Sequence, residues 1–459
     1  MRVYALYLLV AFLSVYAYRH WFRSLCGLIL LMAVIEHPDM PKNIMGIQGL
    51  NPWNIVLVNV LVGWLINRRR EGLVWDMPRP LNVLLVLYLL IVLVGSLRMF
   101  GDRTHLEMFT TAELISENLI NTVKWAIPGL LVFDGCRSRR QLLWGLTSIL
   151  VMYFLLTVQV IRWMPPSATL TADSLTSRAG KIIQNEVGYH RVNMSMMLAG
   201  ASWAIFSVAS STKRRMHSGL LFAAALLVAY AQALTAGRMG YLTWGAVGLT
   251  LCLLRWRKYL VLLPVVVVVI GLAVPGAVER ALRGFGETDV TGEVYIDDYE
   301  VTAGRTLMWP IVIDKIGESP LVGYGRQAMV RTGLRDHIRN QYGDGFRHPH
   351  NAYLEWLLDN GMVGFLCVIP FYVIVVVQAG RLFVDRRSPW CTAVGGVALS
   401  LVLALLIASM GSQTFYPREG AVGMWAAIGL MLRVWQGLST RGSDVQRFLN
   451  PRTAPFGNR

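Results

Sequence analysis

The chain has 459 residues, of which 55% are hydrophobic and only 15% are charged. A soluble domain cannot bury so large an apolar fraction, so the composition indicates a membrane protein with many spans and excludes an ordinary soluble enzyme. The formal net charge of +16 would by itself suggest a nucleic-acid partner, but the positions of the basic residues argue against one.

Apolar stretches of about 20 residues, the length that crosses a bilayer core of about 30 Å, recur along the chain. We predict an all-α polytopic membrane protein with about 12 or 13 transmembrane helices. The candidate segments are 3–18, 20–36, 51–67, 80–98, 119–136, 139–162, 187–210, 216–235, 238–256, 259–276, 353–380, 391–410 and 420–437. In this division, residues 1–276 and 351–437 are two groups of spans, a large loop covers 277–350, and 438–459 form a polar tail.

Short clusters of Lys and Arg follow every second predicted span, which is the pattern that places basic loops in the cytoplasm. The clearest are "RRR" at 68–70, "RSRR" at 137–140, "KRR" at 213–215 and "RWRK" at 255–258. The loop at 277–350 then lies on the opposite side, as does the N-terminus if thirteen spans alternate. Between residues 277 and 347 it holds nine Lys or Arg and eleven Asp or Glu, so it is not a basic patch for nucleic acid.

Two features of the large loop are visible in its pattern. Residues 302–317 place Arg305 and Trp309 on one helical face, although Pro310 favours a helix that begins near Trp309. Residues 286–300 contain six carboxylates and no basic residue. Such a run is typical of a solvated face, with a cation site as the alternative.

The stretch "RHPHNAYLEWLLDNG" from residue 347 joins the loop to the next span. Asn351 is a good N-cap for a helix that stops at the Asp359–Gly361 turn. Free amides at that helix start would favour an anion beside Arg347 and His350. In the plainer alternative, the loop simply ends here and the histidines lie at a wet interface.

A metal site is a third reading of this stretch, because His348 and His350 could both ligate zinc. Zinc needs three or four protein ligands, and no cysteine or second histidine pair accompanies these two. The five cysteines are scattered without paired spacing. We therefore expect neither a metal nor any other cofactor.

Polar residues also occur at the boundaries of other spans. Arg238 in "TAGRMGY" lies in a hairpin between two apolar segments, where it either has a function or merely snorkels to the surface. Arg191 and Asn193 in "HRVNMSMML" lie at a depth where polar groups normally face a protein cavity. Lys124 either lines that cavity or pairs with an acid.

Three stretches taken together resemble the O-antigen ligase and O-antigen polymerase superfamily of bacterial membrane glycosyltransferases. They are "LTAGRMGYL" around Arg238, "AGRTLMWPIVIDKIGESPLVGYG" at 303–325, and "HPHNAYLEWLLDNGMVGF" from His348. The likeness covers roughly residues 190–380, whereas the first 180 residues match only as a series of spans. Family members commonly have twelve spans with both termini in the cytoplasm, so the resemblance leaves twelve or thirteen spans open.

The resemblance implies a multi-pass protein of the bacterial inner membrane whose active site faces the periplasm. The implied reaction moves a glycan from an undecaprenyl-pyrophosphate donor to a sugar hydroxyl, without a metal. Arg238 and Arg305 would bind the pyrophosphate as it leaves, since the planar guanidinium matches phosphate oxygens. His350 would take the proton of the acceptor hydroxyl. The expected substrate-binding residues are Arg347, His348, Asn351, Arg191, Asn193, Trp309 and Tyr353.

The residues do not name the acceptor. A ligase would use lipid A core and a polymerase would use another lipid-linked glycan, in lipopolysaccharide or exopolysaccharide biosynthesis. The alternative from another class is a flippase for polyprenyl-linked glycans or a secondary transporter. Transporters often show internal repeats and broken helices near the midplane, whereas the informative polar groups of this sequence gather in and around one asymmetric loop, which favours an enzyme.

Overall fold

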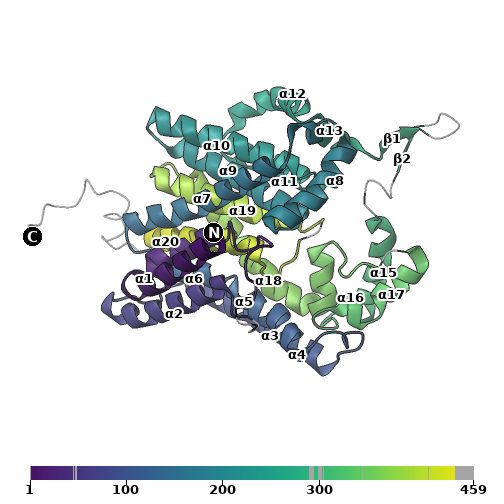
Figure 1. The fold of residues 1–459 in the computed structure, drawn as a ribbon, viewed down its shortest axis with the longest axis horizontal. Coiled ribbons are helices and arrows are strands. Elements are labelled where there is room, and N and C mark those ends of the chain that lie inside the picture. Colours follow the sequence, from purple (N-terminus) through teal and green to yellow (C-terminus); the bar gives the residue numbers. More distant parts are fainter. Residues whose placement is uncertain are drawn as a thin grey trace, which may run out of the picture.

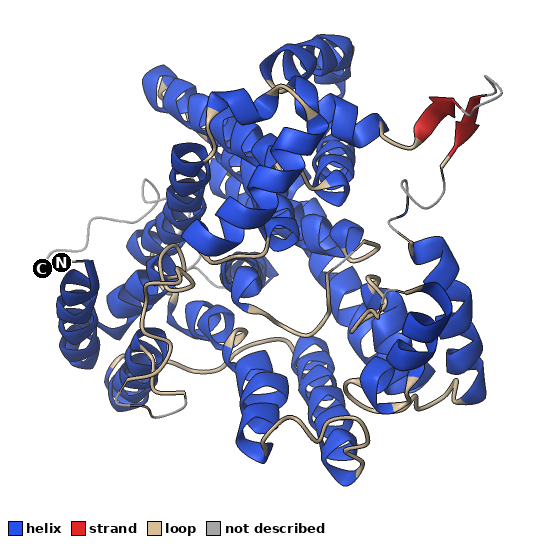
Figure 2. Cartoon of the chain, turned by 45° about the vertical axis from the view of Figure 1, so that its right-hand side comes forward, coloured by secondary structure: helices blue, strands red, loops and turns tan. Residues whose placement is uncertain are grey.

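The computed structural model describes residues 2–288 apart from 45, 47 and 48, and residues 294–439 apart from 298–301, 303, 344 and 412. Most of the acidic run at 286–300 and nearly all of the predicted tail at 438–459 lie outside these residues. The described chain is almost wholly helical, with one short ribbon at the edge of the body (Figure 2). The prediction of an all-α polytopic membrane protein is confirmed.

The long helices pack side by side into one bundle (Figure 1). They are α1 (Arg2–Leu31), α2 (Pro52–Arg70), α3 (Arg79–Gly101), α7 (Arg139–Trp163), α9 (Arg191–Ser211), α10 (Arg215–Leu234), α11 (Arg238–Leu254), α18 (Ala352–Val384), α19 (Pro389–Ala408) and α20 (Val422–Ser439).

Shorter elements connect the long helices or extend from them. They are α4 (Thr111–Ile115), η1 (Ser116–Ile120), α5 (Asn121–Lys124), α6 (Ile127–Gly135), η2 (Pro166–Thr169), α8 (Ala172–Ile182), η3 (Ile183–Val187), η4 (Arg257–Leu262), α12 (Leu263–Ala273), α13 (Pro275–Leu282), β1 (Phe285–Thr288), β2 (Val294–Ile296), α15 (Arg305–Glu318), α16 (Ala328–Arg331), α17 (Leu334–Tyr342) and η5 (Glu419–Ala421). Strands β1 and β2 pair antiparallel.

Every predicted segment is helical, but not every one is a long continuous helix. Eight helices within the described residues are long and apolar enough to cross a membrane. The other predicted segments differ in identifiable ways. The segment at 119–136 is split into α5 and α6, α11 has 17 residues, α12 has 11, and α2 carries three asparagines along its apolar length.

The first two predicted segments form α1, which reverses direction at His20. That residue has non-helical backbone angles (φ −140°, ψ 56°), and the Ser24 hydroxyl donates to the carbonyl oxygen of Leu13 at 2.9 Å. In a straight helix these residues would be about 16 Å apart along the axis. Helix α1 is therefore a hairpin of two arms, as the sequence predicted from two separate apolar stretches.

The bundle has two distinct ends. One, here called the loop end, carries α8, α13 and α15 to α17 (Figure 1). At the opposite end, Arg433 donates to both carboxylate oxygens of Asp76 at 2.8 Å, and Arg137 joins the same carboxylate at 3.2 Å. Helix α20 runs between the two ends, because it starts just after Arg418 and carries Arg433 near its last turn. The basic clusters at 68–70, 137–140, 213–215 and 255–258 lie at or just after the last residues of α2, α6, α9 and α11. These helix ends are at the end of the bundle opposite to the loop end.

Helices α15, α16 and α17 form a loop subdomain, residues 304–343, with an apolar core of its own. That core contains Met308, Val312, Ala328, Met329, Leu334 and Ile338, together with Leu358 of α18. Helix α15 begins at Arg305 and not near Trp309, so the start predicted from Pro310 is wrong. Burial of Met308 before the proline and Val312 after it offsets the backbone hydrogen bond that Pro310 cannot make.

A break in α18 holds the subdomain against the bundle. Gly361 has φ 62° and ψ −168°, which interrupts the helix where the sequence predicted a stop. The amides of Tyr324 and Gly325 donate to the carbonyl oxygens of Leu358 and Asp359 at 2.9 and 2.6 Å. Beyond the break, the amides of α18 donate back to the carbonyl oxygens of Pro320 and Leu321. The subdomain is thus attached through backbone groups that a continuous helix would have used internally.

Candidate functional site

Helix α15 brings Arg305 and the His-Pro-His segment together. The indole Nε1 of Trp309 donates to the carbonyl oxygen of Pro349 at 2.9 Å. Arg305 lies at the first helical position, one turn before Trp309, and interacts electrostatically with both His348 and His350. The imidazole rings of His348 and His350 are edge to face, with centroids 4.3 Å apart. These three predicted residues therefore share one site.

Arg305 is a partly buried cation whose hydrogen-bonding capacity is not used up. Its Nε is buried and has no hydrogen-bond partner. Burial lowers the pKa of its guanidinium from the usual value, although arginine stays charged. Because an unsatisfied buried donor costs about 1–3 kcal/mol, this arrangement favours an anionic ligand that could accept from it.

The environment of His350 keeps its imidazole neutral. Burial, followed by His348, Arg305 and His190, lowers the pKa of His350 from 6.5 to about 3. The pKa of His348 is also lowered, by burial first and then by Arg418 and Arg305, although Glu355 acts in the opposite sense. The imidazole is neutral at neutral pH and is a weak base until nearby positive charge is compensated.

The amides at the start of α18 are not free. The Oδ1 of Asn351 accepts from the amides of Tyr353 and Leu354 at 3.0 and 3.3 Å. The amide of Ala352 donates to the carbonyl oxygen of Ser409 at 2.7 Å, and that of Glu355 to Asn351. Asn351 is an N-cap as predicted, but its capping oxygen occupies the place where the predicted anion would bind.

A second group of arginines gathers where α9, α11 and α13 begin or end at the loop end. The Nε of Arg238 donates to the carbonyl oxygen of Arg280 at 2.9 Å, and Arg191 donates to the carbonyl oxygen of Ala236 at 3.1 Å. Arg191 and Arg280 interact electrostatically, and the Nε of Arg280 is buried without a partner. Three guanidinium groups, those of Arg191, Arg238 and Arg280, therefore gather here, and Arg191 and Arg280 have no carboxylate partner in the part of the chain that the structure describes.

Small residues allow this cluster to form. The hydroxyl of Ser195 on α9 donates to the carbonyl oxygen of Gly237 at 3.4 Å. A Cβ on Gly240 would overlap the Ser195 hydroxyl. The absence of a side chain at this position lets the α10–α11 hairpin pack closely on the first turns of α9. Arg191 and Arg238, which are 47 positions apart in the sequence, are thereby brought together.

His190 and Arg418 connect the two groups. His190 precedes Arg191 and interacts electrostatically with Arg418 and His348. Burial, then Arg191, Arg418 and His348, lowers the pKa of His190. The two positive groups therefore lie along one face of the loop end, with histidines between them.

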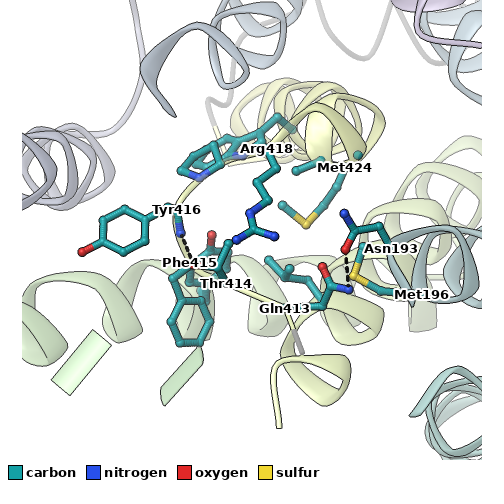
Figure 3. A pocket seen from close by; sticks show the side chains of 14 residues that line it. Asn193, Met196, Gln413, Thr414, Phe415, Tyr416, Arg418 and Met424 are labelled. Carbon is teal, nitrogen blue, oxygen red and sulfur yellow. Dashed lines mark hydrogen bonds between the residues drawn. The ribbon is translucent and has the colours of Figure 1, made fainter. Parts of the chain in front are cut away.

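Arg418 lines a small cavity at the start of α20 (Figure 3). The cavity has a volume of about 20 Å³. Gln413 donates to the Oδ1 of Asn193 at 3.1 Å in its wall, and the Arg418 side chain extends into it. The predicted cavity-facing role of Asn193 is consistent with this position.

A second cavity of about 20 Å³ lies below the His-Pro-His segment and is lined by Arg347, His348, Glu355 and Arg326, among others. The guanidinium of Arg326 lies 3.2 Å from the centroid of the Tyr416 ring, and its Nη1 is buried without a partner. The hydroxyl of Tyr416 donates to the Oδ2 of Asp359 at 2.9 Å. Arg347 is exposed and lies in this cavity wall, away from Arg238.

The remaining predicted residues have structural contacts. The Tyr353 hydroxyl donates to the carbonyl oxygen of Leu406 at 2.9 Å, and Trp309 is bonded to the backbone of Pro349. The ammonium of Lys124 donates to the Oδ1 of Asn54 at 3.2 Å and interacts with Glu36 and Glu419. Lys124 also lies over the ring of Trp125, with its ammonium 4.3 Å from the ring centroid.

Sequence reasoning missed three residues of this face: Arg280, Arg326 and Arg418. A signal was present for the arginines, because all three fall on the side where the positive-inside pattern makes basic residues less expected. None stands in a run of basic residues, and only the fold places them near Arg238 and Arg305.

Comparison with known proteins covers the part of the chain that holds much of the candidate site. Residues 220–369, which include Arg238, Arg305 and His350, match the O-antigen ligase family model. A putative polysaccharide ligase of Rickettsia conorii is 24% identical over 187 residues, 39% of this chain and 44% of the relative. The exopolysaccharide production protein ExoQ of Rhizobium meliloti is 27% identical over 147 residues, 31% of each chain.

The chain thus spans less than half the length of these curated relatives. Residues 220–369, which match the family model, nevertheless contain all three stretches on which the sequence resemblance rests. The resemblance to the O-antigen ligase family is confirmed for residues 220–369.

Proposed function

We propose that this protein is a glycosyltransferase that moves a glycan from an undecaprenyl-pyrophosphate donor to a sugar hydroxyl at the periplasmic face of the bacterial inner membrane. The carrying observation is the convergence of Arg305, His348 and His350 with the cluster of Arg191, Arg238 and Arg280 at the loop end. A site with this excess of guanidinium groups fits a diphosphate ligand.

The orientation rests on the charge of the loops. The runs of Lys and Arg follow the helix ends opposite to the loop end, and such runs remain in the cytoplasm. The loop subdomain and the arginine cluster would then face the periplasm. A lipid-linked donor could enter between helices with its tail in the bilayer while its sugar stays in water.

The proposed step is a single displacement at the anomeric carbon. The acceptor oxygen forms the new glycosidic bond, the bond to the pyrophosphate oxygen breaks, and undecaprenyl pyrophosphate leaves with its electron pair. Arg238, Arg280 and Arg305 stabilise the charge that grows on the leaving group. The acceptor's proton goes to His350, whose imidazole is neutral before the reaction. A bound pyrophosphate raises the basicity of His350 by compensating Arg305.

The cavities of about 20 Å³ hold about one water molecule each. A pyrophosphate therefore requires side chains or the loop subdomain to move. The loop subdomain is attached to the bundle through the Trp309 hydrogen bond and the break in α18, and it would move relative to the bundle at these two places. Arg347 and Asn193, in the walls of the two cavities, would contact substrate once these have opened.

The decisive experiment measures transfer in proteoliposomes with a lipid-linked oligosaccharide. Arg305→Lys keeps the charge but loses the planar donor pair, so transfer should fall on the order of a hundredfold. Arg339→Lys in α17, which is exposed, makes the same substitution away from the histidines and should leave transfer unchanged. Equal activity of Arg305→Lys and the wild type would remove Arg305 from the site.

The same assay separates the alternatives. Release of undecaprenyl pyrophosphate with lipid A core as acceptor identifies a ligase, and elongation with donor alone identifies a polymerase. Movement of intact donor across the bilayer without covalent transfer would overturn the proposal in favour of a flippase. Within the described residues, no three His, Cys, Asp or Glu side chains gather as metal ligands would. We propose a metal-independent reaction because the guanidinium groups would supply the positive charge that stabilises the leaving pyrophosphate, and chelator should then leave turnover intact.

A further inference from the structure

A cavity of about 230 Å³ lies at the opposite end of the bundle from His348 and His350. It is open to the surface and is bordered by the reversal of α1 at His20, the start of α7 and the end of α2. Three arginines line it, Arg19, Arg23 and Arg140, whereas Glu71 is its single carboxylate. This cavity is larger than either of the cavities at the loop end described above, and the proposed reaction does not use it.

Two arginines of this cavity, Arg23 and Arg140, lie over one aromatic ring, and the Nη1 of Arg23 also donates to the hydroxyl of Tyr16 at 2.7 Å. The guanidinium of Arg23 lies 4.3 Å from the ring centroid of Trp144, and that of Arg140 lies 5.3 Å from the same ring. Stacking on an aromatic face leaves the in-plane donors of a guanidinium available to a ligand. In the described part of the chain, Arg19, Arg23 and Arg140 form no ion pair with a carboxylate.

The carboxylate of Glu71 is already engaged. Its Oε2 accepts from the indole Nε1 of Trp21 at 3.2 Å. The cavity therefore combines three cationic side chains with one acid and has an unbalanced positive charge. Charge complementarity requires an anion, and the planar guanidinium donors match phosphate oxygens.

The helices that line the cavity also carry exposed apolar rows. On α1, Leu8, Phe12 and Val15 are 74%, 60% and 73% exposed. On α7, Val151, Leu155 and Val158 repeat the same helical spacing and are also exposed. Helices α1 and α7 pack against each other, so both helices that border the cavity also carry exposed apolar side chains suited to contact with lipid. A free phosphate would use only the cavity, whereas a phospholipid would use both the cavity and these apolar side chains.

We propose that this cavity binds the phosphate headgroup of an anionic phospholipid, with the acyl chains along the exposed rows of α1 and α7. Basic pockets between membrane helices on the cytoplasmic side suit such headgroups. The proposal shares with the glycosyl-transfer proposal only the orientation of the chain in the membrane, because none of the residues named for that reaction lines the cavity.

The test uses the purified full chain in a neutral detergent and measures bound lipid by native mass spectrometry. Wild-type protein should retain phosphatidylglycerol more tightly than phosphatidylcholine. Removing both stacked guanidinium groups, in Arg23→Gln with Arg140→Gln, should weaken phosphatidylglycerol binding roughly 25-fold, about fivefold for each. Arg139→Gln is the matched control, because Arg139 neighbours Arg140 but lies over Trp390 outside the cavity.

Three outcomes would overturn the proposal. The first is unchanged phosphatidylglycerol binding by the double variant. The second is an equal loss in Arg139→Gln, which would mean that only the general charge of this face matters. The third is displacement of the lipid by an equal concentration of inorganic phosphate, which would identify a soluble phosphate site.

A pair of charge-preserving substitutions distinguishes a specific loss of lipid binding from a loss caused by misfolding. Arg23→Lys with Arg140→Lys keeps two cations but loses the planar donors, so phosphatidylglycerol binding should be intermediate while the thermal unfolding midpoint stays near that of the wild type. If this pair binds as tightly as the wild type, stacked guanidinium groups are not the recognition element and the proposed geometry is wrong.

Discussion

The indole of Trp309 is hydrogen bonded to the carbonyl oxygen of Pro349 at 2.9 Å, which fixes α15 against the segment that carries His348 and His350. This bond joins residues that are 40 positions apart and sets the relation of Arg305 to the histidines. Arg305 is one turn before Trp309 on the same helix, so a shift of Trp309 moves the guanidinium.

Replacing Trp309 by Phe keeps an aromatic ring but removes the donor. A net hydrogen bond contributes about 1 kcal/mol, so kcat/KM for transfer should fall roughly fivefold. Trp203→Phe is the control, because it removes an indole bond of similar length (2.8 Å) to the carbonyl oxygen of Trp244, which lies outside the site. If both variants lose the same activity, the effect is one of general stability.

The arginine cluster predicts a difference between neighbours on the chain. Arg280 has a buried Nε without a partner, whereas Arg283 forms an ion pair with Asp173 at 2.5 Å. In Arg280→Gln, kcat/KM for the lipid-linked donor should fall on the order of a hundredfold because a donor to the leaving group is lost. Arg283→Gln should retain transfer, and a comparable fall in both would mean that the cluster acts only through overall charge.

The buried environment of His350 predicts two different pH profiles. Burial and neighbouring cations lower its pKa to about 3 in the free protein. Since kcat/KM reports the free enzyme and kcat the complex, titration of His350 should leave kcat/KM flat from about pH 8 to about pH 5. As the pH is lowered, kcat should begin to fall at a higher pH than kcat/KM does, because bound pyrophosphate raises the pKa of His350. In His350→Gln, this fall of kcat at acidic pH should disappear. A fall that persists in the variant would belong to another titrating group.

The same lowered pKa predicts how stability depends on pH. The folded protein keeps His350 neutral down to about pH 3, whereas the unfolded chain binds the proton near pH 6.5. This contribution to stability is therefore present above pH 6.5 and is lost progressively as the pH falls. Thermal unfolding of His350→Gln should depend less on pH in this range than that of the wild type.

The break in α18 predicts opposite effects for two glycines of one helix. At φ 62° and ψ −168°, Gly361 occupies a region open essentially to glycine alone, and a Cβ there would overlap the backbone of Leu321. Gly361→Ala should destabilise the protein by about 2 kcal/mol or more and release the loop subdomain, with loss of transfer. A Cβ on Gly380 meets no atom within 4 Å, so Gly380→Ala should be neutral or stabilising by up to about 1 kcal/mol. Thermal unfolding in detergent measures both, and equal midpoints for the two variants would contradict this account of the break.

Much of the fold could be predicted from the sequence, because the length of an apolar stretch and the position of a basic loop depend only on residues that are close together in the chain. The helical segments, the stop at Gly361 and the cap at Asn351 all follow from the properties of residues close together in the chain. Expectations failed where a distant contact overrode the local rule. Pro310 did not start α15, because the subdomain core buries Met308, and the α18 amides were satisfied by Asn351 and by Ser409 from another segment.

By itself the sequence determined that this is a polytopic helical membrane protein, and it named Arg238, Arg305 and His350 through motifs whose residues are neighbours in the chain. Only the tertiary structure decided that Arg191 and Arg280 join Arg238, that His190 and Arg418 lie between the two positive groups, and that burial keeps His350 neutral. The physical reason is that electrostatic interaction and desolvation depend on distance and burial in space. Both are set by the packing of helices that lie far apart in the sequence.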